Sequence, residues 1–340
     1  MITSLLMQMA ERGLLPDGVI RAGIRRLCRQ RDASLDPLSA AAARDRFIED
    51  MRSRTLAEVP ELANAQHYEV PAEFYELCLG SHRKYSCCLW DDATDLDAAE
   101  ASALEASAQH ADLQDGQDIL ELGCGWGSFT LWMASRYPNS RIIAISNSHG
   151  QRRSIERSAR ERGLDNIEVR TVDVNVLELD ERFDRIVSIE MMEHLRNWPR
   201  LLQLMKSWLR PDGAAFVHVF CHRTTPYRFD PSGPGDWMSR EFFSGGIMPS
   251  LDLLPSIDDD MVVETQWEWN GMEYARTAEA WLQRLDANRS AALQVLAADP
   301  HGARRAFQRW RMFFLACAEC FAMAGGERWL VGHYRLRPRT

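Results

Sequence analysis

The sequence predicts an α/β fold: a doubly wound, mostly parallel sheet of seven strands with a helical N-terminal segment and an inserted lid. From 117 to 220, short apolar strands alternate with helices, which is typical of a parallel sheet with crossover helices. Residues 1 to about 58 show helical periodicity instead. The alternation stops after 221, and residues 222–260, with their Pro, Gly and Trp, indicate an insertion.

Each element follows from its local pattern, apolar runs for strands and 3.6-residue periodicity for helices. Gly163 is the predicted C-cap of the second core helix, and Pro211 and Gly213 are predicted to close the third. The predicted strands are 117–123, 141–146, 167–173, 183–190, 214–220, 261–269 and one near 329–336. The predicted helices between and after them are 128–137, 150–163, 198–213, about 277–297 and 301–323.

Composition excludes several classes of protein. The 340 residues are 46% hydrophobic and 26% charged, as in ordinary globular proteins, and a net charge of −9 argues against nucleic-acid binding. No apolar run approaches the roughly 20 residues of a membrane span, and the N-terminus lacks a basic signal region, so we expect a cytoplasmic protein. Eight scattered cysteines fit reduced thiols, and the Cys317–Cys320 pair has no second pair to complete a zinc site, so no metal is expected.

The N-terminal segment contains an amphipathic helix at 19–31. It places Ile20, Ile24 and Leu27 on one face and arginines around the other. One interpretation is a helix that docks on the protein with a solvated basic face. The other is a helix that lies on an anionic membrane surface, which would add peripheral membrane contact.

The stretch ILELGCGWGSF, residues 119–129, indicates a nucleotide-binding loop. Gly123, Gly125 and Gly127 follow a strand at alternate positions, which differs from the dinucleotide fingerprint, and no Gly-Lys-Ser/Thr follows to make a Walker loop. Glycine allows close backbone approach to a ligand and positive φ. Glu121, just before the glycines, suits a cationic or hydroxyl-bearing group, which favours S-adenosylmethionine (SAM) with its ammonium group and positive sulfur.

The chain resembles the class I SAM-dependent methyltransferases and, within them, the group that joins cyclopropane fatty acid synthases to plant coclaurine N-methyltransferases. The resemblance runs through nearly the whole chain. It rests on ILELGCGWGS and on the words GLLPDGVIRAGIRRL, HYEVPAEFYELCLG, KYSCCLW, ISNSHGQ, FDRIVSIEMMEH, DWMSREFFSGGIMPS, WLQRLDAN and GGERWLVGH.

The resemblance implies a set of SAM contacts. Asn147 and Gln151 would supply amide hydrogen bonds where most of the class has an acid after the second strand. For Asp173, the structural alternative is a solvated strand end. The implied contacts are Tyr85 and Ser86 to the methionine carboxylate, Gly123, Gly125 and Gly127 with Glu121 under the methionine and ribose, Asn147 and Gln151, Asp173 and Val174 at the adenine edge, and the Ile189 backbone.

The two branches of this group act on different acceptors and require different residues. Cyclopropane synthases use a bound bicarbonate as the base that removes a proton after alkene methylation. Its holders match Cys87, Glu193, His218 and Tyr274, and a neighbouring Ile of that family is Phe220 here. The structural alternatives are a buried small thiol for Cys87, a helix cap for Glu193, a core histidine for His218 and simple packing for Tyr274.

The amine branch offers its own candidate residue. Glu69 resembles an acid that contacts the substrate amine in the plant enzymes, and an acid near an ammonium group is physically sensible. The long matching words favour the amine enzymes, whereas the pocket residues favour the alkene enzymes. Cys317 matches a cysteine once regarded as catalytic in cyclopropane synthases, but its apolar helix suggests a packed thiol.

The sequence therefore predicts a SAM-dependent methyltransferase, with the unsaturated acyl chain of a lipid as the preferred acceptor and bicarbonate as the base. N-methylation of a small, partly aromatic amine is the alternative, and a SAM-binding protein without catalysis is a third reading. A homodimer is also expected. The predicted segments are 1–58, helical; 59–115, an active-site cap with SAM contacts; and 116–340, the methyltransferase core, with 222–300 as a substrate lid.

Overall fold

The computed structural model describes residues 2–35, 39–58, 70–230, 236–257 and 259–339. Its centre is a sheet of seven strands in the order β3-β2-β1-β4-β5-β9-β8. The first five in this order pair in parallel, while β9 runs antiparallel to both β5 and β8. The predicted doubly wound, mostly parallel sheet is confirmed. The strands are β1 (Asp118–Leu122), β2 (Arg141–Ser146), β3 (Ile167–Thr171), β4 (Phe183–Ile189), β5 (Leu209–His222), β8 (Met261–Trp269) and β9 (Trp329–Pro338).

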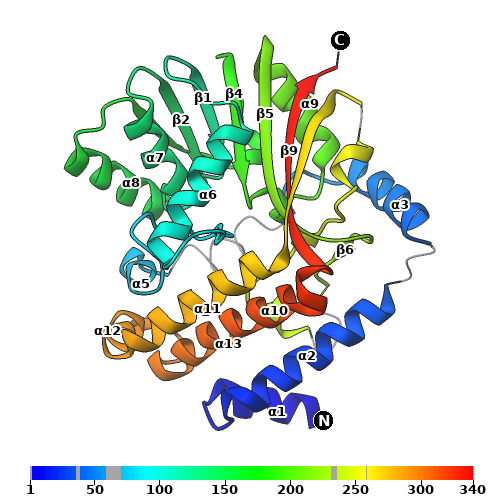
Figure 1. Ribbon diagram of the computed structural model, residues 1–340, viewed down its shortest axis with the longest axis vertical. Coiled ribbons are helices and arrows are strands. Elements are labelled where there is room, and N and C mark those ends of the chain that lie inside the picture. The colour runs from blue at the N-terminus through cyan, green and yellow to red at the C-terminus, as the bar shows by residue number, and fades with distance from the viewer. Residues whose placement is uncertain (1, 36–38, 59–69, 231–235, 258, 340) are drawn as a thin grey trace.

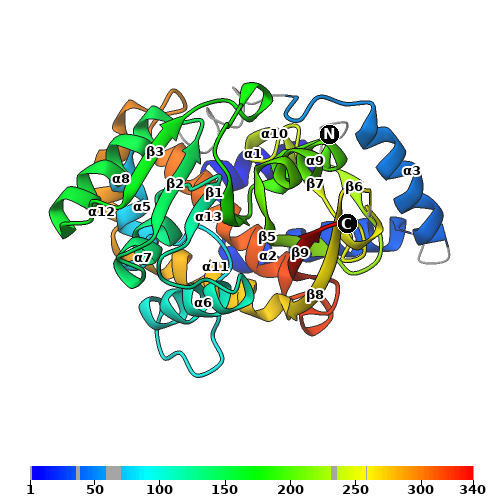
Figure 2. The ribbon, with the colours of Figure 1, turned by 90° about the horizontal axis from the view of Figure 1, so that it is seen from above.

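Helices cover both faces of this sheet (Figure 2). Because side chains alternate along a strand, Ile119 and Ile142 pack towards one face and Leu120 and Ile143 towards the other. The first face is covered by α6 and α7, with α8 beside them, and the second by α9 and α3. Their bounds are α6 (Leu96–His110), α7 (Ser128–Arg136), α8 (His149–Arg162), α9 (Trp198–Trp208) and α3 (Ala40–Arg52).

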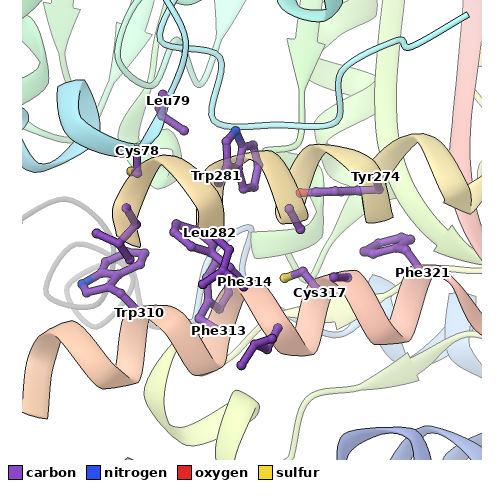
Figure 3. Packing of buried hydrophobic residues seen from close by; sticks show 14 of the residues in the cluster. Cys78, Leu79, Tyr274, Trp281, Leu282, Trp310, Phe313, Phe314, Cys317 and Phe321 are labelled. Carbon is purple, nitrogen blue, oxygen red and sulfur yellow. The ribbon is translucent and has the colours of Figure 1, made fainter. Parts of the chain in front are cut away.

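A separate helical layer lies across one end of the sheet (Figure 1). In this layer, α11 and α13 pack side by side, and a cluster of buried aromatic rings lies between them (Figure 3). Helix α2 lies against α13. The elements of this layer are α1 (Ile2–Glu11), α2 (Asp17–Ser34), α5 (Ala72–Cys78), α11 (Gly271–Ala287), α12 (Arg289–Val295) and α13 (Ala303–Phe321); the short elements β6 (Tyr227–Arg228), α10 (Trp237–Glu241) and β7 (Ile247–Met248) lie between β5 and β8 in the chain.

The basic face of α2 is partly used inside the protein. Arg21 pairs with Glu279 of α11 at 2.5 Å and with Glu319 of α13 at 3.0 Å, and Arg25 also pairs with Glu319. Ile20 is buried against the same layer. These contacts support the docking interpretation of this helix. Within the described ranges, no helix is long and apolar enough to cross a bilayer.

The predicted bounds of two helices are wrong, whereas the Gly163 cap of α8, with φ 67°, is confirmed. Helix α9 ends at Trp208, so Pro211 and Gly213 lie in an irregular stretch of β5, where the pairing with β4 shifts register. Helix α11 begins at Gly271, six residues before the predicted start, and the helical run is interrupted at Asn288. The substrate lid at 222–300 stays a prediction; within that range, the predicted strand 261–269 is β8, which pairs with β9 at the edge of the main sheet.

Close packing at the start of α11 yields a stability prediction. A Cβ on Gly271 would overlap the carbonyl oxygens of Trp329 and Phe321, whereas a Cβ on Gly23 of α2 would meet no atom within 4 Å. We expect Gly271→Ala to lower the free energy of unfolding by about 1–3 kcal/mol through overpacking. Gly23→Ala should raise it by about 0.5–1 kcal/mol, because alanine favours the helix. Chemical denaturation measures both, and equal shifts would contradict the proposed contact.

Candidate active site

A cavity opens at the carboxyl ends of β1, β2 and β4, where doubly wound folds bind ligands. Helices α11 and α13 contribute Tyr274, Trp281 and Phe313 to its wall. Of the residues predicted to contact SAM, Gly127 alone is absent from the lining. The others all line the cavity: Tyr85, Ser86, Glu121, Gly123, Gly125, Asn147, Gln151, Asp173, Val174 and Ile189.

The three glycines of the loop after β1 all have positive φ, between 53° and 81°, but they serve different purposes. A Cβ on Gly123 would overlap the side chain of Met191, and one on Gly127 would come within 2.6 Å of Ile155. At Gly125 a Cβ would meet no protein atom within 4 Å, and this residue lines the cavity. Two glycines therefore permit packing, and Gly125 keeps the cavity open.

The cavity presents polar groups that suit a ligand rich in hydroxyl and charged groups. The Gln151 amide oxygen accepts from Ser146 Oγ at 2.7 Å, while its buried Nε2 has no partner in the described part of the chain. The buried Ser128 hydroxyl is likewise unpaired among those residues and was not predicted. Asp173 caps the next turn by accepting from Asn175 N at 2.8 Å. The unpaired Gln151 amide fits its predicted contact to SAM, and Ser128 adds a second hydroxyl in the same cavity.

Glu121 is a buried acid in the part of the cavity that the predicted SAM contacts line, called the SAM half below. Its carboxyl group accepts a 2.5 Å hydrogen bond from Thr130 Oγ1. Burial raises its pKa to about 7. A bound cation would therefore favour the ionised form, in agreement with the predicted role beside the positively charged end of SAM.

One part of the cavity is lined by Glu190, Phe220, Phe243, Tyr274 and Phe313, and we call it the acceptor half. It is organised by Glu190, which the sequence analysis missed. Its Oε1 accepts from Cys87 N at 2.9 Å and lies 3.1 Å from His218 Nε2, and its Oε2 accepts from the Tyr274 hydroxyl at 2.6 Å. Glu190 follows β4 directly and has φ 46°, a strained conformation for a residue with a side chain. Its position at the carboxyl end of a central strand is the signal that identifies it.

The four residues predicted to hold bicarbonate do not surround a free space. Tyr274 lines the cavity, as does Phe220, whereas Cys87, Glu193 and His218 are absent from its lining. Glu193 Oε1 accepts from the Phe220 backbone N–H at 2.8 Å.

Glu190 contacts the other three of these residues. Its carboxylate contacts Cys87 N, the His218 ring and the Tyr274 hydroxyl. A bicarbonate would have to displace this carboxylate or lie beside it as a second anion. The residues present therefore do not fit a bound bicarbonate.

Glu190 and Glu193 both have raised pKa values. Burial raises the pKa of Glu190, and Lys84 and the donors from Cys87 and Tyr274 lessen the rise. Burial and the neighbouring Glu190 together raise the pKa of Glu193 well above its usual range. Glu193 therefore holds its proton more firmly, and Glu190 is the acid of the pair that ionises first.

Two further groups near the cavity are uncharged. Burial lowers the pKa of His194 to about 4, so a neutral imidazole lines the cavity. The sequence analysis did not select His194, although it lies in the same motif as Glu193. Burial also raises the pKa of the Cys87 thiol, whose Sγ donates to Cys88 O at 3.4 Å. Cys87 is thus a protonated, packed thiol that contributes its backbone N–H.

Aromatic rings form much of the remaining wall. Phe220, Phe243, Tyr274, Trp281 and Phe313 all line the cavity. Figure 3 shows Tyr274 and Trp281 projecting from α11 opposite the rings of α13.

The remaining candidates lie elsewhere. Cys317 is buried in α13 away from the lining, and burial raises its pKa, as expected of a packed thiol. Within the described ranges no group of three His, Cys, Asp or Glu could hold a metal ion. Glu69, the predicted amine contact, lies outside the described residues.

Comparison with known proteins identifies the chain's family. Residues 58–327 match the family described as mycolic acid cyclopropane synthetase. The chain is 35% identical over 338 residues to (S)-coclaurine N-methyltransferase of Thalictrum flavum subsp. glaucum, covering 96% of this chain and 94% of the relative. It is 28% identical over 276 residues to the cyclopropane-fatty-acyl-phospholipid synthase of Escherichia coli strain K12, covering 79% and 67%.

Solved structures agree with these matches. A crystal structure of coclaurine N-methyltransferase bound to N-methylheliamine and SAH superposes with a TM-score of 0.93 at 35% identity, covering 98% of each chain. The cyclopropane synthase MmaA2 from Mycobacterium tuberculosis, at 20% identity, shares the fold with a TM-score of 0.71 over 84% of this chain and 100% of the other. The predicted resemblance is confirmed, and the reading as a SAM-binding protein without catalysis is set aside. The chain belongs to the mycolic acid cyclopropane synthetase family and is a SAM-dependent methyltransferase.

Proposed function

We propose that this enzyme transfers the methyl group of SAM to the nitrogen of a small, partly aromatic amine. The observation that carries the proposal is the Glu190 carboxylate at the acceptor half of the cavity, held by Cys87, His218 and Tyr274. An amine arrives in water mostly as its ammonium ion and must lose a proton before it can attack. A carboxylate at this place can bind the ammonium ion and accept that proton.

The preferred sequence prediction, methylation of a lipid alkene, has weaker support. An alkene forms a carbocation on methylation, and in the predicted mechanism a bicarbonate held by Cys87, Glu193, His218 and Tyr274 removes the proton. Glu190 already contacts three of these residues, and Glu193 bonds to the backbone of Phe220. The 35% identity to an N-methyltransferase, against 28% to a lipid synthase, agrees with the amine alternative.

The site's own residues have distinct roles in this proposal. Tyr274 and Cys87 hold the Glu190 carboxylate towards the acceptor. The rings of Phe220, Phe243 and Phe313 would pack on the apolar part of the amine and exclude water, and aromatic faces also attract its ammonium form. Bound SAM supplies a methyl group on a positively charged sulfur. The protein then contributes mainly the orientation needed for in-line transfer.

The acceptor class can be tested with methyl-labelled SAM. The purified enzyme is given (S)-coclaurine in one reaction and vesicles of unsaturated phosphatidylethanolamine in another, each with and without bicarbonate. We expect N-methylated amine, formed at the same rate without bicarbonate, and no label in the acyl chains. Mass spectrometry locates the label, and incorporation at acyl carbon that requires bicarbonate would sink the amine proposal.

Glu190→Gln should abolish most activity without preventing cofactor binding. The amide keeps the shape of the side chain but cannot accept the proton, so kcat/KM for the amine should fall by at least about 100-fold. SAH affinity, measured by calorimetry, should stay unchanged. Glu49→Gln, at a side chain that is 77% exposed on α3, is the matched control and should retain full activity. An active Glu190→Gln enzyme would rule out the assigned role.

Gly125→Ala should weaken SAM binding. Its Cβ would stand in the cavity, and we expect SAH affinity to fall by roughly tenfold or more because two atoms cannot share that space. Gly163→Ala is the control, because Gly163 also has positive φ and open space around it but lies at the end of α8, away from the cavity. Both variants carry the same backbone strain, so calorimetry should show reduced SAH affinity in Gly125→Ala alone.

A further inference from the structure

Lysine is rare in this chain, and one of its lysines is buried at the cavity. Of the 40 lysine and arginine residues in the sequence, only Lys84 and Lys206 are lysines. Lys206 lies on α9, and its side chain is 38% exposed. Lys84 is 1% exposed and lines the cavity. A buried ammonium group is stable only when hydrogen bonds and an opposite charge compensate it.

The backbone that leads to Lys84 is held by a buried acid. The carboxyl group of Glu100, on α6, accepts from the backbone N–H groups of Gly80 and His82, each at 2.8 Å. It also accepts from the backbone N–H of Lys84 at 3.2 Å. Glu100 itself is fully buried. Helix α6 therefore fixes the position of Lys84 against the cavity.

The Lys84 ammonium group donates to two uncharged acceptors. Its Nζ lies 2.5 Å from Ser86 Oγ and 2.6 Å from the Cys87 carbonyl oxygen. Within the described ranges it forms no ion pair with a carboxylate. Arg83, which also lines the cavity, pairs with Glu76 at 2.7 Å. Of these two adjacent cations, Lys84 is the one that can still bind an anion.

Two acids sense the charge of Lys84 without contacting its ammonium group. Burial raises the pKa values of Glu100 and Glu190, and Lys84 lessens both rises. Glu100 accepts from backbone N–H groups, and Glu190 accepts from the Cys87 backbone and the Tyr274 hydroxyl. The direct partners of both carboxyl groups are thus other donors than Lys84 Nζ.

Ser86 directs the charge of Lys84 towards the cavity. Because Ser86 Oγ accepts from Lys84, its own hydroxyl proton points elsewhere. No acceptor for this proton lies among the residues that the structure describes, and Ser86 lines the cavity. Hydrogen bonds in a chain polarise one another, so a hydroxyl that accepts from an ammonium group is a stronger donor. Ser86 therefore presents a donor that is backed by a positive charge.

The methyl donor has one group that suits this arrangement. The carboxylate of its aminoacyl tail is the only anionic group of SAM, and it needs a cation or strong donors where water is excluded. In the described lining of the cavity, the Lys and Arg side chains are Arg83 and Lys84. Since Arg83 already has a carboxylate partner, Lys84 is the cation that matches the tail.

We propose that Lys84 is the counter-ion of the SAM carboxylate and acts through the Ser86 hydroxyl. Ser86 donates to the carboxylate, and Lys84 supplies the positive charge behind that hydrogen bond. Lys84 is thus a positioning residue, because a tail held at Ser86 also orients the sulfur. The sequence resemblance implied the Ser86 contact but did not select Lys84. The inference concerns the methyl donor alone and does not depend on the acceptor.

The binding of two ligands tests this role without any acceptor. SAH carries the carboxylate, and its decarboxylated analogue, S-adenosyl-3-thiopropylamine, lacks only that group. Lys84→Met keeps an unbranched side chain but removes the charge. We expect its SAH affinity, measured by calorimetry, to fall by roughly 10- to 100-fold, the usual range for loss of a hydrogen bond to a charged group. Its affinity for the analogue should not fall.

Three variants serve as controls. Lys206→Met removes the exposed lysine of α9 and should keep the wild-type preference for SAH over the analogue. Ser86→Ala removes the proposed donor and should lose the preference, and it decides the question if Lys84→Met does not fold. In the double variant the two losses should not add, because Lys84 acts through Ser86.

Three results would overturn the inference. If Lys84→Met weakens the binding of SAH and of the analogue equally, Lys84 supports the fold of its segment and is not the counter-ion. If Ser86→Ala keeps the full preference for SAH, the hydroxyl does not carry the contact. Additive losses in the double variant would show that Lys84 does not act through Ser86.

Discussion

The structure depends on one buried carboxylate. Glu190 lies at the carboxyl end of β4 and accepts hydrogen bonds from the segment that carries Cys87 and from Tyr274 of α11, and it contacts His218 of β5. A charged group in such a place is stable only when it is paired and hydrogen-bonded. The contacts that satisfy Glu190 therefore also tie the helical layer to the sheet. The active site and the packing of α11 on the sheet cannot be changed independently.

The same carboxylate helps to explain how one family can serve different acceptors. The SAM half of the cavity is formed by the glycine loop and by the ends of β1, β2 and β3. These segments bind the methyl donor and place few constraints on the identity of the acceptor. We infer that the acceptor half depends on the carboxyl group between β4 and α11. In this chain that group belongs to Glu190, and the pKa of the neighbouring Glu193 is raised well above its usual range. A fixed carboxylate suits an acceptor that arrives as a cation.

The helical layer encloses this charge. Rings from α11 and α13 pack as one aromatic cluster, with Tyr274 stacked on Phe321 at 4.3 Å (Figure 3). Ion pairs from Arg21 to Glu279 and Glu319 hold α2 against the outside of this cluster. Helix α11 therefore supplies both a part of the aromatic wall, through Tyr274 and Trp281, and the hydrogen bond that orients Glu190.

The sequence by itself determined the doubly wound sheet, the family and the methyl donor. Those features follow from local patterns. The glycine loop, Glu121, Asn147 and Asp173 each lie at or directly after the end of an apolar strand, and parallel strands bring their carboxyl ends together. The strand patterns predicted seven strands, but they did not predict that β8 lies at the edge beside β9, because that pairing joins residues more than 60 positions apart.

The tertiary structure determined which residues line the acceptor half of the cavity. The sequence offered both Glu190 and Glu193 in one short motif, and the family resemblance selected Glu193. Which of the two reaches the cavity is set by the backbone after β4, where Glu190 takes a positive φ, and by donors from distant segments that only the folded chain brings to it. Local sequence patterns do not encode either condition, because both arise from packing between elements.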